Sequence, residues 1–205
     1  MIVIALLALL SANAFAGSKP QKESINDKTL NGKMADNTDW VSYEQYITEA
    51  IEKKLKGTPI KFKNLTEISF KRLLKKIEEQ DSNFVNLGFK YVLLADGATA
   101  EVLCTSLGVV SEKNAELFLK NAEYLYNTLL AHNEKKWFYD ILSSILTSLG
   151  PDYVDMFKEQ QKILYKRVES LRAYKGKDYK SIQNISIAIL NKGISSLEQA
   201  ILYSE

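Results

Sequence analysis

Apolar residues recur three and four positions apart along most of the chain, and polar residues fill the positions between them. This spacing places the apolar side chains on one face of an α-helix, as for Ile47, Ala50 and Ile51 in the first such segment. No segment shows a convincing β-hairpin pattern. The pattern therefore predicts an all-α fold of eight or nine helices, over residues 40–56, 67–80, 84–95, 98–107, 112–131, 134–149, 152–174, 179–192 and 195–203.

Residues that favour helix ends lie between these segments. Gly150-Pro151 follows the sixth predicted helix, where glycine ends a helix well and proline cannot continue it. Ser111 is the expected N-cap of the helix over 112–131. Ser195 and Glu198 have capping-box spacing, which predicts that the last helix starts there.

A weak internal repeat indicates how the helices are arranged. Three predicted helices end near Gly108, Gly150 and Gly193, and these glycines are 42 and 43 residues apart. This separation resembles the period of two-helix solenoid repeats of the HEAT and armadillo type. The sequence thus predicts stacked antiparallel helix pairs in a short solenoid, and the alternative is an irregular helical bundle whose helices resemble one another by coincidence. The proposed units are 84–108, 111–150 and 152–193.

The N-terminal segment has the pattern of a secretory signal peptide. An apolar run over 2–10 leads into Ala14-Phe15-Ala16 before Gly17, which is a typical cleavage sequence. The run is too short to span a bilayer. It lacks the usual preceding positive charge, and a buried first helix is the alternative interpretation. The sequence therefore predicts an exported chain, periplasmic or extracellular, without a transmembrane segment after cleavage.

This prediction divides the chain into a signal peptide, a polar and flexible leader, and one folded domain. The leader contains few apolar residues and would bury little surface. The folded part is long enough to build its own hydrophobic core. The expected division is 1–16 for the signal peptide, 17–38 for the leader and 39–205 for a single all-helical domain.

Charge and cysteine content exclude several classes of function. The chain has 27 basic and 25 acidic residues and a net charge of +2 at pH 7, so a nucleic-acid partner is not expected. Cys104 is the sole cysteine, which excludes an internal disulfide. Its apolar neighbours favour a buried, inert thiol over an intermolecular bridge.

No catalytic, metal or cofactor motif is recognisable. His132 is the sole histidine, and no cysteine lies at ligand spacing from it, so no transition-metal site is expected. Its place at a predicted helix end suits a bond to the last carbonyls. Asp152 and Asp155 are expected in the first turn of a helix, where negative charge is favourable, rather than in a catalytic pair. We therefore assign no catalytic residue, no metal ligand and no cofactor.

Two predicted turns combine basic and aromatic residues. If the helix pairs stack, both turns lie along one edge, which would suit an acidic protein or another anionic surface. The alternative is that the lysines are merely solvated while Trp137 and Tyr139 face the core. The candidate partner-binding residues are Lys135, Lys136, Trp137, Tyr139, Arg172, Tyr174, Lys175, Lys177, Tyr179 and Lys180.

These features favour a secreted, periplasmic binding protein that is not an enzyme and that recognises another macromolecule. An inhibitor or an immunity protein against an envelope-acting toxin would fit the predicted export. The alternatives are a cell-envelope enzyme that uses carboxylates and a secreted structural or host-directed factor. A deep pocket with two converging acids would favour the enzyme, and a shallow apolar and aromatic surface would favour binding.

Overall fold

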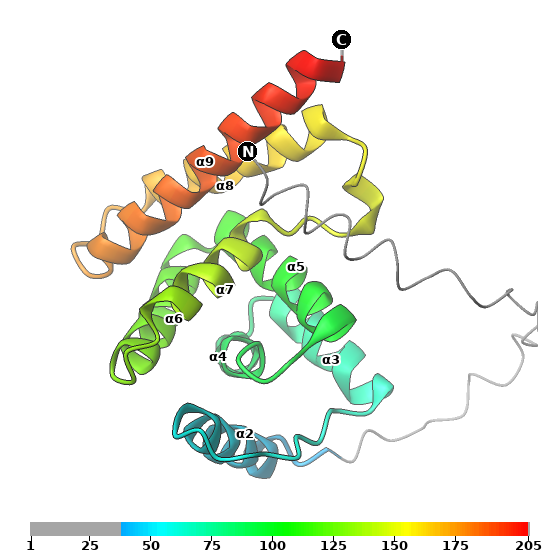
Figure 1. Ribbon diagram of the computed structural model, residues 1–205, viewed down its shortest axis with the longest axis vertical. Coiled ribbons are helices and arrows are strands. Elements are labelled where there is room, and N and C mark those ends of the chain that lie inside the picture. Colours follow the sequence, from blue (N-terminus) through cyan, green and yellow to red (C-terminus); the bar gives the residue numbers. More distant parts are fainter. Residues whose placement is uncertain (1–37, 205) are drawn as a thin grey trace, which may run out of the picture. The chain divides into compact units, whose positions relative to one another are not determined.

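The computed structural model describes residues 38–204. No strand occurs among them, so the predicted all-α class is confirmed. The predicted signal peptide over 1–16 and nearly all of the predicted leader over 17–38 lie outside the described residues. The described elements are α2 (Trp40–Leu55), α3 (Glu67–Glu78), α4 (Ser82–Tyr91), α5 (Gly97–Lys113), α6 (Ala115–Leu130), α7 (Lys135–Thr147), the 3-10 turn η1 (Pro151–Tyr153), α8 (Phe157–Ala173) and α9 (Lys180–Ser204) (Figure 1).

Polar side chains cap the starts of several helices. The Asp39 carboxylate accepts hydrogen bonds from the backbone N–H groups of Val41 and Ser42 at 3.1 and 3.2 Å. The Ser42 hydroxyl also donates to it, and these bonds hold the pKa of Asp39 below its usual value. Thr66 accepts from the N–H of Ser69 at the start of α3. These bonds satisfy N–H groups that have no partner within the helix.

The predicted boundary between α5 and α6 is wrong. The helix α5 continues through both Gly108 and Ser111. The Ser111 side chain is buried, and its hydroxyl donates to the carbonyl oxygen of Gly108 at 2.7 Å, so it caps nothing. Asn114 ends α5 instead, and its side chain caps α6 by accepting from the N–H of Leu117 at 3.1 Å.

The last two predicted helices form one helix, α9, which passes through Gly193 and Ser195. A Cβ at Gly193 would lie 3.2 Å from Leu164 and 3.3 Å from Thr147. This glycine therefore marks the point where α9 lies close to both α8 and α7. Ser195 therefore opens no helix. Of the three glycines taken as equivalent helix ends, Gly108 and Gly193 lie inside helices, and Gly150 follows α7 with a φ of 84°. That equivalence is wrong, and the stacking of helix pairs stays a prediction.

The segment predicted as one helix over 152–174 is broken near its start. Asp152 lies in η1, Asp155 lies in the turn after it, and α8 begins at Phe157. The two aspartates are thus not in the first turn of α8, which corrects the prediction. The Gln160 amide donates to the backbone carbonyls of Tyr153 and Val154, and these bonds attach η1 to α8.

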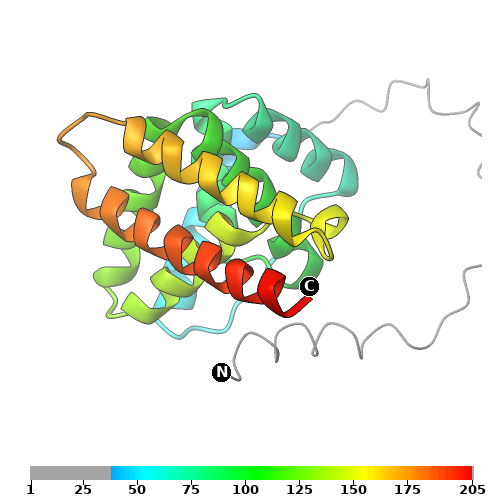
Figure 2. The same ribbon diagram turned by 90° about the horizontal axis from the view of Figure 1, so that it is seen from above.

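The helix α5 lies at the centre of the packing and contacts α3, α4, α6, α7 and α8. The helices α8 and α9 form an antiparallel pair that packs beside α7 (Figures 1 and 2). All the described helices belong to one compact unit, Asp36–Glu205. None of the helices within residues 38–204 is both long and apolar enough to cross a bilayer.

Arg167 on α8 is the largest fully buried side chain among the described residues, with 2% of its surface exposed. Its Nη1 donates to the carbonyl oxygens of Leu146 and Ser148 at 2.6 and 3.2 Å, at the C-terminal end of α7. Burial lowers the pKa of Arg167 to about 10, so the guanidinium remains charged at neutral pH. A cation at this position suits the negative end of the helix dipole and fixes the end of α7.

Candidate functional site

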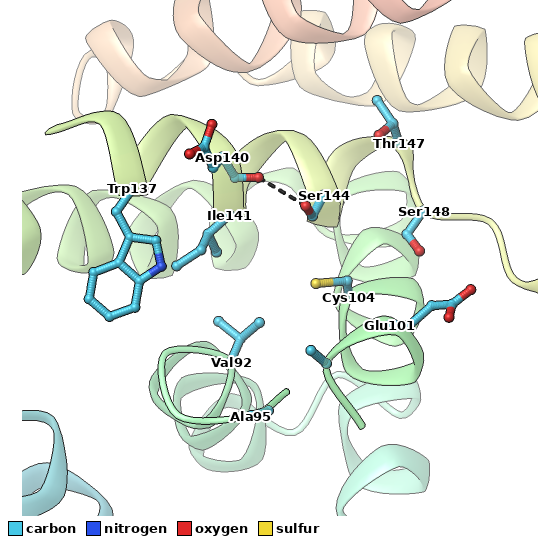
Figure 3. Close-up of a pocket in the computed structure, with 11 residues that line it drawn as sticks. Val92, Ala95, Glu101, Cys104, Trp137, Asp140, Ile141, Ser144, Thr147 and Ser148 are labelled. Carbon is cyan, nitrogen blue, oxygen red and sulfur yellow. Dashed lines mark hydrogen bonds between the residues drawn. The ribbon is translucent and has the colours of Figure 1, made fainter. Parts of the chain in front are cut away.

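A groove of about 440 Å³ lies between α7 on one side and α5 and the end of α4 on the other (Figure 3). Binding pockets commonly have volumes of about 300–1,000 Å³. The polar residues of the lining are Glu101, Asp140, Ser144, Thr147 and Ser148. The apolar residues of the lining, with the cysteine included, are Val92, Ala95, Ala100, Cys104, Trp137 and Ile141.

Helical spacing explains how α7 forms one wall of this groove. Trp137, Ile141, Ser144 and Ser148 are three or four positions apart, so their side chains leave the helix on the same face. Figure 3 shows Trp137 and Ile141 pointing toward Val92 at the end of α4. The apolar floor thus lies at one end of the groove, and the hydroxyl groups lie at the other.

The hydroxyl groups beside the groove each donate a hydrogen bond within the fold. Ser144, Thr147 and Thr105 each donate to the backbone carbonyl four residues earlier, at 2.9, 2.8 and 3.0 Å. Ser148 lies 3.1 Å from the Thr105 oxygen, and because the Thr105 proton is in use, Ser148 must be the donor of that pair. In this arrangement all four oxygens have lone pairs free to accept further hydrogen bonds.

Cys104 lies in the groove wall with 4% of its surface exposed, so its predicted burial is confirmed. Burial, reinforced by the charge of Glu101, raises the pKa of Cys104 to about 11. The thiol is therefore protonated at neutral pH, whereas the thiolate is the nucleophilic form. This cysteine is not prepared for nucleophilic catalysis.

The two carboxylates of the groove do not converge. Figure 3 shows Asp140 and Glu101 at separate positions, with their carboxylate groups pointing in different directions. Both side chains are exposed. Among residues 38–204, no group of three or more histidine, cysteine, aspartate or glutamate side chains could hold a metal ion. The arrangement of Asp140 and Glu101 thus differs from the facing pair of acids that a carboxylate-based hydrolase uses.

Trp137 is the one predicted partner-binding residue that lines this groove. The Lys54 ammonium lies 4.9 Å from the centre of its ring, in a cation–π contact, and donates to the carbonyl oxygen of Leu93 at 2.8 Å. Burial lowers the pKa of Lys54, and the charge of Asp96 opposes this effect. These contacts hold the indole in place at its end of the groove.

The other predicted residues lie in two turns or in the helix ends beside them, and these turns are on the same side of the helical body but at separate positions (Figures 1 and 2). Lys135 and Lys136 are exposed in the first turn of α7, where Tyr139 is partly buried and packs its ring edge-on against Phe138. His132 is exposed just after α6, close to the position that the sequence predicts.

The remaining predicted partner-binding residues lie in or beside the turn between α8 and α9. The rings of Tyr174 and Tyr179 stack with their centres 6.2 Å apart. Lys175 donates to the carbonyl oxygen of Arg172, and Lys180 donates to the Gln183 side chain. Lys177 is exposed in the same turn.

Acidic side chains lie close to this turn. Partial burial and the charges of Glu116, Asp178 and Glu123 together raise the pKa of Tyr174. Two of these acids belong to α6, which packs against both α8 and α9. The predicted basic edge is therefore interrupted by negative charge, although whether it binds a partner stays a prediction.

Most residues that line the groove were not predicted from the sequence. Glu101 lies on an otherwise apolar part of α5, and Asp140, Ser144 and Ser148 form a polar row on α7, four positions apart. A polar row along a helix that is buried on its other faces is the signal that could have indicated this site.

Comparison with protein families, with curated proteins and with solved structures finds no match to this chain.

Proposed function

We propose that this chain is an exported binding protein, without catalytic activity, that recognises another macromolecule through the groove between α5 and α7. One observation carries the proposal: the groove combines an apolar and aromatic floor with polar groups that are not arranged for catalysis. The carboxylates of Asp140 and Glu101 point in different directions, and the Cys104 thiol is protonated at neutral pH. Export follows from the predicted signal peptide, and inhibition of an envelope-acting toxin is the role that suits such a chain.

The test is capture of a partner by the purified chain from an envelope extract of the source cells. Ser144→Trp would fill the groove from an exposed position on α7, whereas Ser195→Trp adds the same bulk at an exposed position on α9. We expect the unchanged chain and the Ser195→Trp variant to retain the same macromolecule and the Ser144→Trp variant to lose it. Equal capture by both variants would contradict the proposal.

The basic edge is a second surface in this proposal, with an acidic protein as its expected partner. Lys135 and Lys136 are exposed cations there, and Lys177 is another in the second turn. Charge reversal of these three lysines to glutamate would weaken capture if the edge steers the partner. Reversal of Lys53, Lys61 and Lys63, which are exposed on α2 and in the segment after it and take no part in the ion pairs of the described residues, is the matched control. If both charge reversals change partner capture equally, the basic edge has no role in binding the partner.

A further inference from the structure

We infer that the groove between α5 and α7 receives an arginine side chain from the surface of its protein partner, flanked there by apolar residues. This inference rests on the proposed function and specifies the chemistry of the partner. Its physical basis is that the polar atoms of the groove are almost all hydrogen-bond acceptors, and the charged ones are all negative.

The first observation is the set of acceptors. The hydroxyl groups of Ser144, Thr147 and Ser148 each donate a hydrogen bond within the fold, so in this arrangement their oxygens offer lone pairs to an incoming group. The carboxylates of Asp140 and Glu101 are acceptors as well. A guanidinium has five N–H donors in one plane and can satisfy several separate acceptors at once, which a single ammonium or hydroxyl cannot.

The second observation is the charge of the lining. Glu101 and Asp140 are exposed, and neither takes part in the ion pairs formed within residues 38–204. No lysine or arginine is part of the lining. Lys54 lies beside Trp137, where its ammonium is held by the indole ring and the Leu93 carbonyl. The lining itself therefore carries two negative charges and no positive one, with the Lys54 ammonium beside it, although the whole chain carries +2. An acidic group would be repelled here, and a cation would be attracted.

The third observation is the apolar floor. Val92 and Ile141 are largely buried, with 6% and 8% of their surfaces exposed, and they face the same space as Trp137 (Figure 3). The methylene groups of an arginine can lie on such a floor while the charged end reaches the acidic margin. The volume of about 440 Å³ suits one or two side chains. The indole N–H of Trp137 is a donor that suits a backbone carbonyl of the partner.

The test uses Trp137 as an internal fluorescent reporter. The chain has two tryptophans, and Trp40 packs against Phe84, outside the groove, so Trp40→Phe leaves Trp137 as the sole reporter. The probes are the peptides acetyl-Gly-Leu-Arg-Leu-Gly-amide and the same peptide with neutral citrulline, or with glutamate, in place of arginine. We expect a saturable change in Trp137 fluorescence with the arginine peptide, and binding at least about fivefold weaker with citrulline, as expected from the loss of charge-assisted bonds.

Neutralising the groove gives the second arm of the test. Glu101→Gln with Asp140→Asn should weaken binding of the arginine peptide about two- to fivefold, the range expected from losing one exposed ion pair, because the two carboxylates point in different directions and one guanidinium pairs with one of them. The preference for arginine over citrulline should largely disappear. Asp152→Asn with Asp155→Asn changes the net charge equally near η1 and should leave the affinity unchanged.

The outcomes separate this inference from the proposed function. Equal binding of the arginine and citrulline peptides, stronger binding of the glutamate peptide, or no saturable response at millimolar concentrations would overturn the inference. If Ser144→Trp nevertheless abolishes partner capture, the proposed function stands and only the chemistry of the partner is wrong. If arginine is preferred but Ser144→Trp leaves capture intact, the proposed function fails, and the inferred partner contact at the groove fails with it.

Discussion

A Cβ atom at Gly108 would lie 2.8 Å from both Nη atoms of Arg167 and 2.6 Å from the carbonyl oxygen of Ile145. Helices α5, α7 and α8 therefore meet at a point where α5 can have no side chain. A glycine inside a helix costs about 1 kcal/mol relative to alanine. Here it allows Arg167 to reach the end of α7, where a charged hydrogen bond contributes about 1.5–3 kcal/mol.

Gly108→Ala should therefore destabilise the protein, by about 1–3 kcal/mol, because the added methyl group forces the guanidinium or the backbone of α7 to move. The sign of this stability change is diagnostic, since a glycine-to-alanine substitution at an unstrained helical position stabilises a protein by about 0.4–1 kcal/mol. Urea unfolding followed by circular dichroism measures the change. Ser195→Ala, at an exposed position of α9, is the control and should stay within about 0.5 kcal/mol. A more stable Gly108→Ala variant would contradict the packing described here.

Leu146→Ala should cost about 2–5 kcal/mol, because Leu146 has 0% of its surface exposed and truncation leaves a cavity. Leu130→Ala removes the same atoms from a side chain that is 43% exposed on α6, so its cost should be clearly smaller. Thermal unfolding of both variants measures the difference. An unchanged melting temperature for Leu146→Ala would mean that the face of α7 is assigned wrongly.

Local patterns were sufficient to predict the helix faces. Ile47, Ala50 and Ile51 share the face that the spacing indicates, and all three are buried. The predicted start of the first helix at residue 40 is also correct, and Asp39 caps it with bonds that form within three residues of the chain. Such signals depend only on residues close in sequence, so they can be recognised from one amino-acid sequence alone.

The same local patterns gave wrong helix boundaries where contacts between residues distant in sequence determine the structure. Gly108 and Ser111 look like the end of one helix and the start of the next, yet α5 continues through both. The reason for the glycine is Arg167, which lies far along the sequence on α8. Gly193 is explained in the same way by Leu164 and Thr147. Local patterns cannot distinguish a glycine that ends a helix from one that allows close packing.

The groove was not predictable because its walls come from separate segments. Val92 follows α4, Cys104 lies on α5 and Trp137 lies on α7. Each residue fits its own helix pattern, and only their packing leaves a space between them. Trp137 was selected for its basic neighbours, whereas its role in the groove depends on contacts with Lys54 and the end of α4.

Export predicts a defined N-terminus. When the full chain is produced in a secreting host, the protein recovered outside the cytoplasm should begin at or near Gly17, after Ala14-Phe15-Ala16. N-terminal sequencing or intact mass measurement distinguishes this product from the uncut chain. Ala16→Pro is the control and should block cleavage at this site. Retention of Met1 in a cytoplasmic product would contradict the prediction.

The Cys104 thiol should resist alkylation in the folded protein. Its pKa is raised from 9.0 to about 11, chiefly by burial, so it stays protonated at pH values where an unfolded thiol has ionised. By linkage, this thiol has no effect on stability below about pH 9, and the folded state loses stability as the pH rises through about 11, because the unfolded thiol ionises first.

Iodoacetamide labelling followed by mass spectrometry tests this at a series of pH values. In the folded chain the rate should reach half its maximum near pH 11, whereas in the chain unfolded by guanidinium it should do so near pH 9.0. The unfolded chain is the matched control, because Cys104 is the sole cysteine in both samples. Equal labelling rates for the two samples at neutral pH would show that the thiol is accessible and ionised, and Cys104 would then have to be reconsidered as a reactive group in the groove.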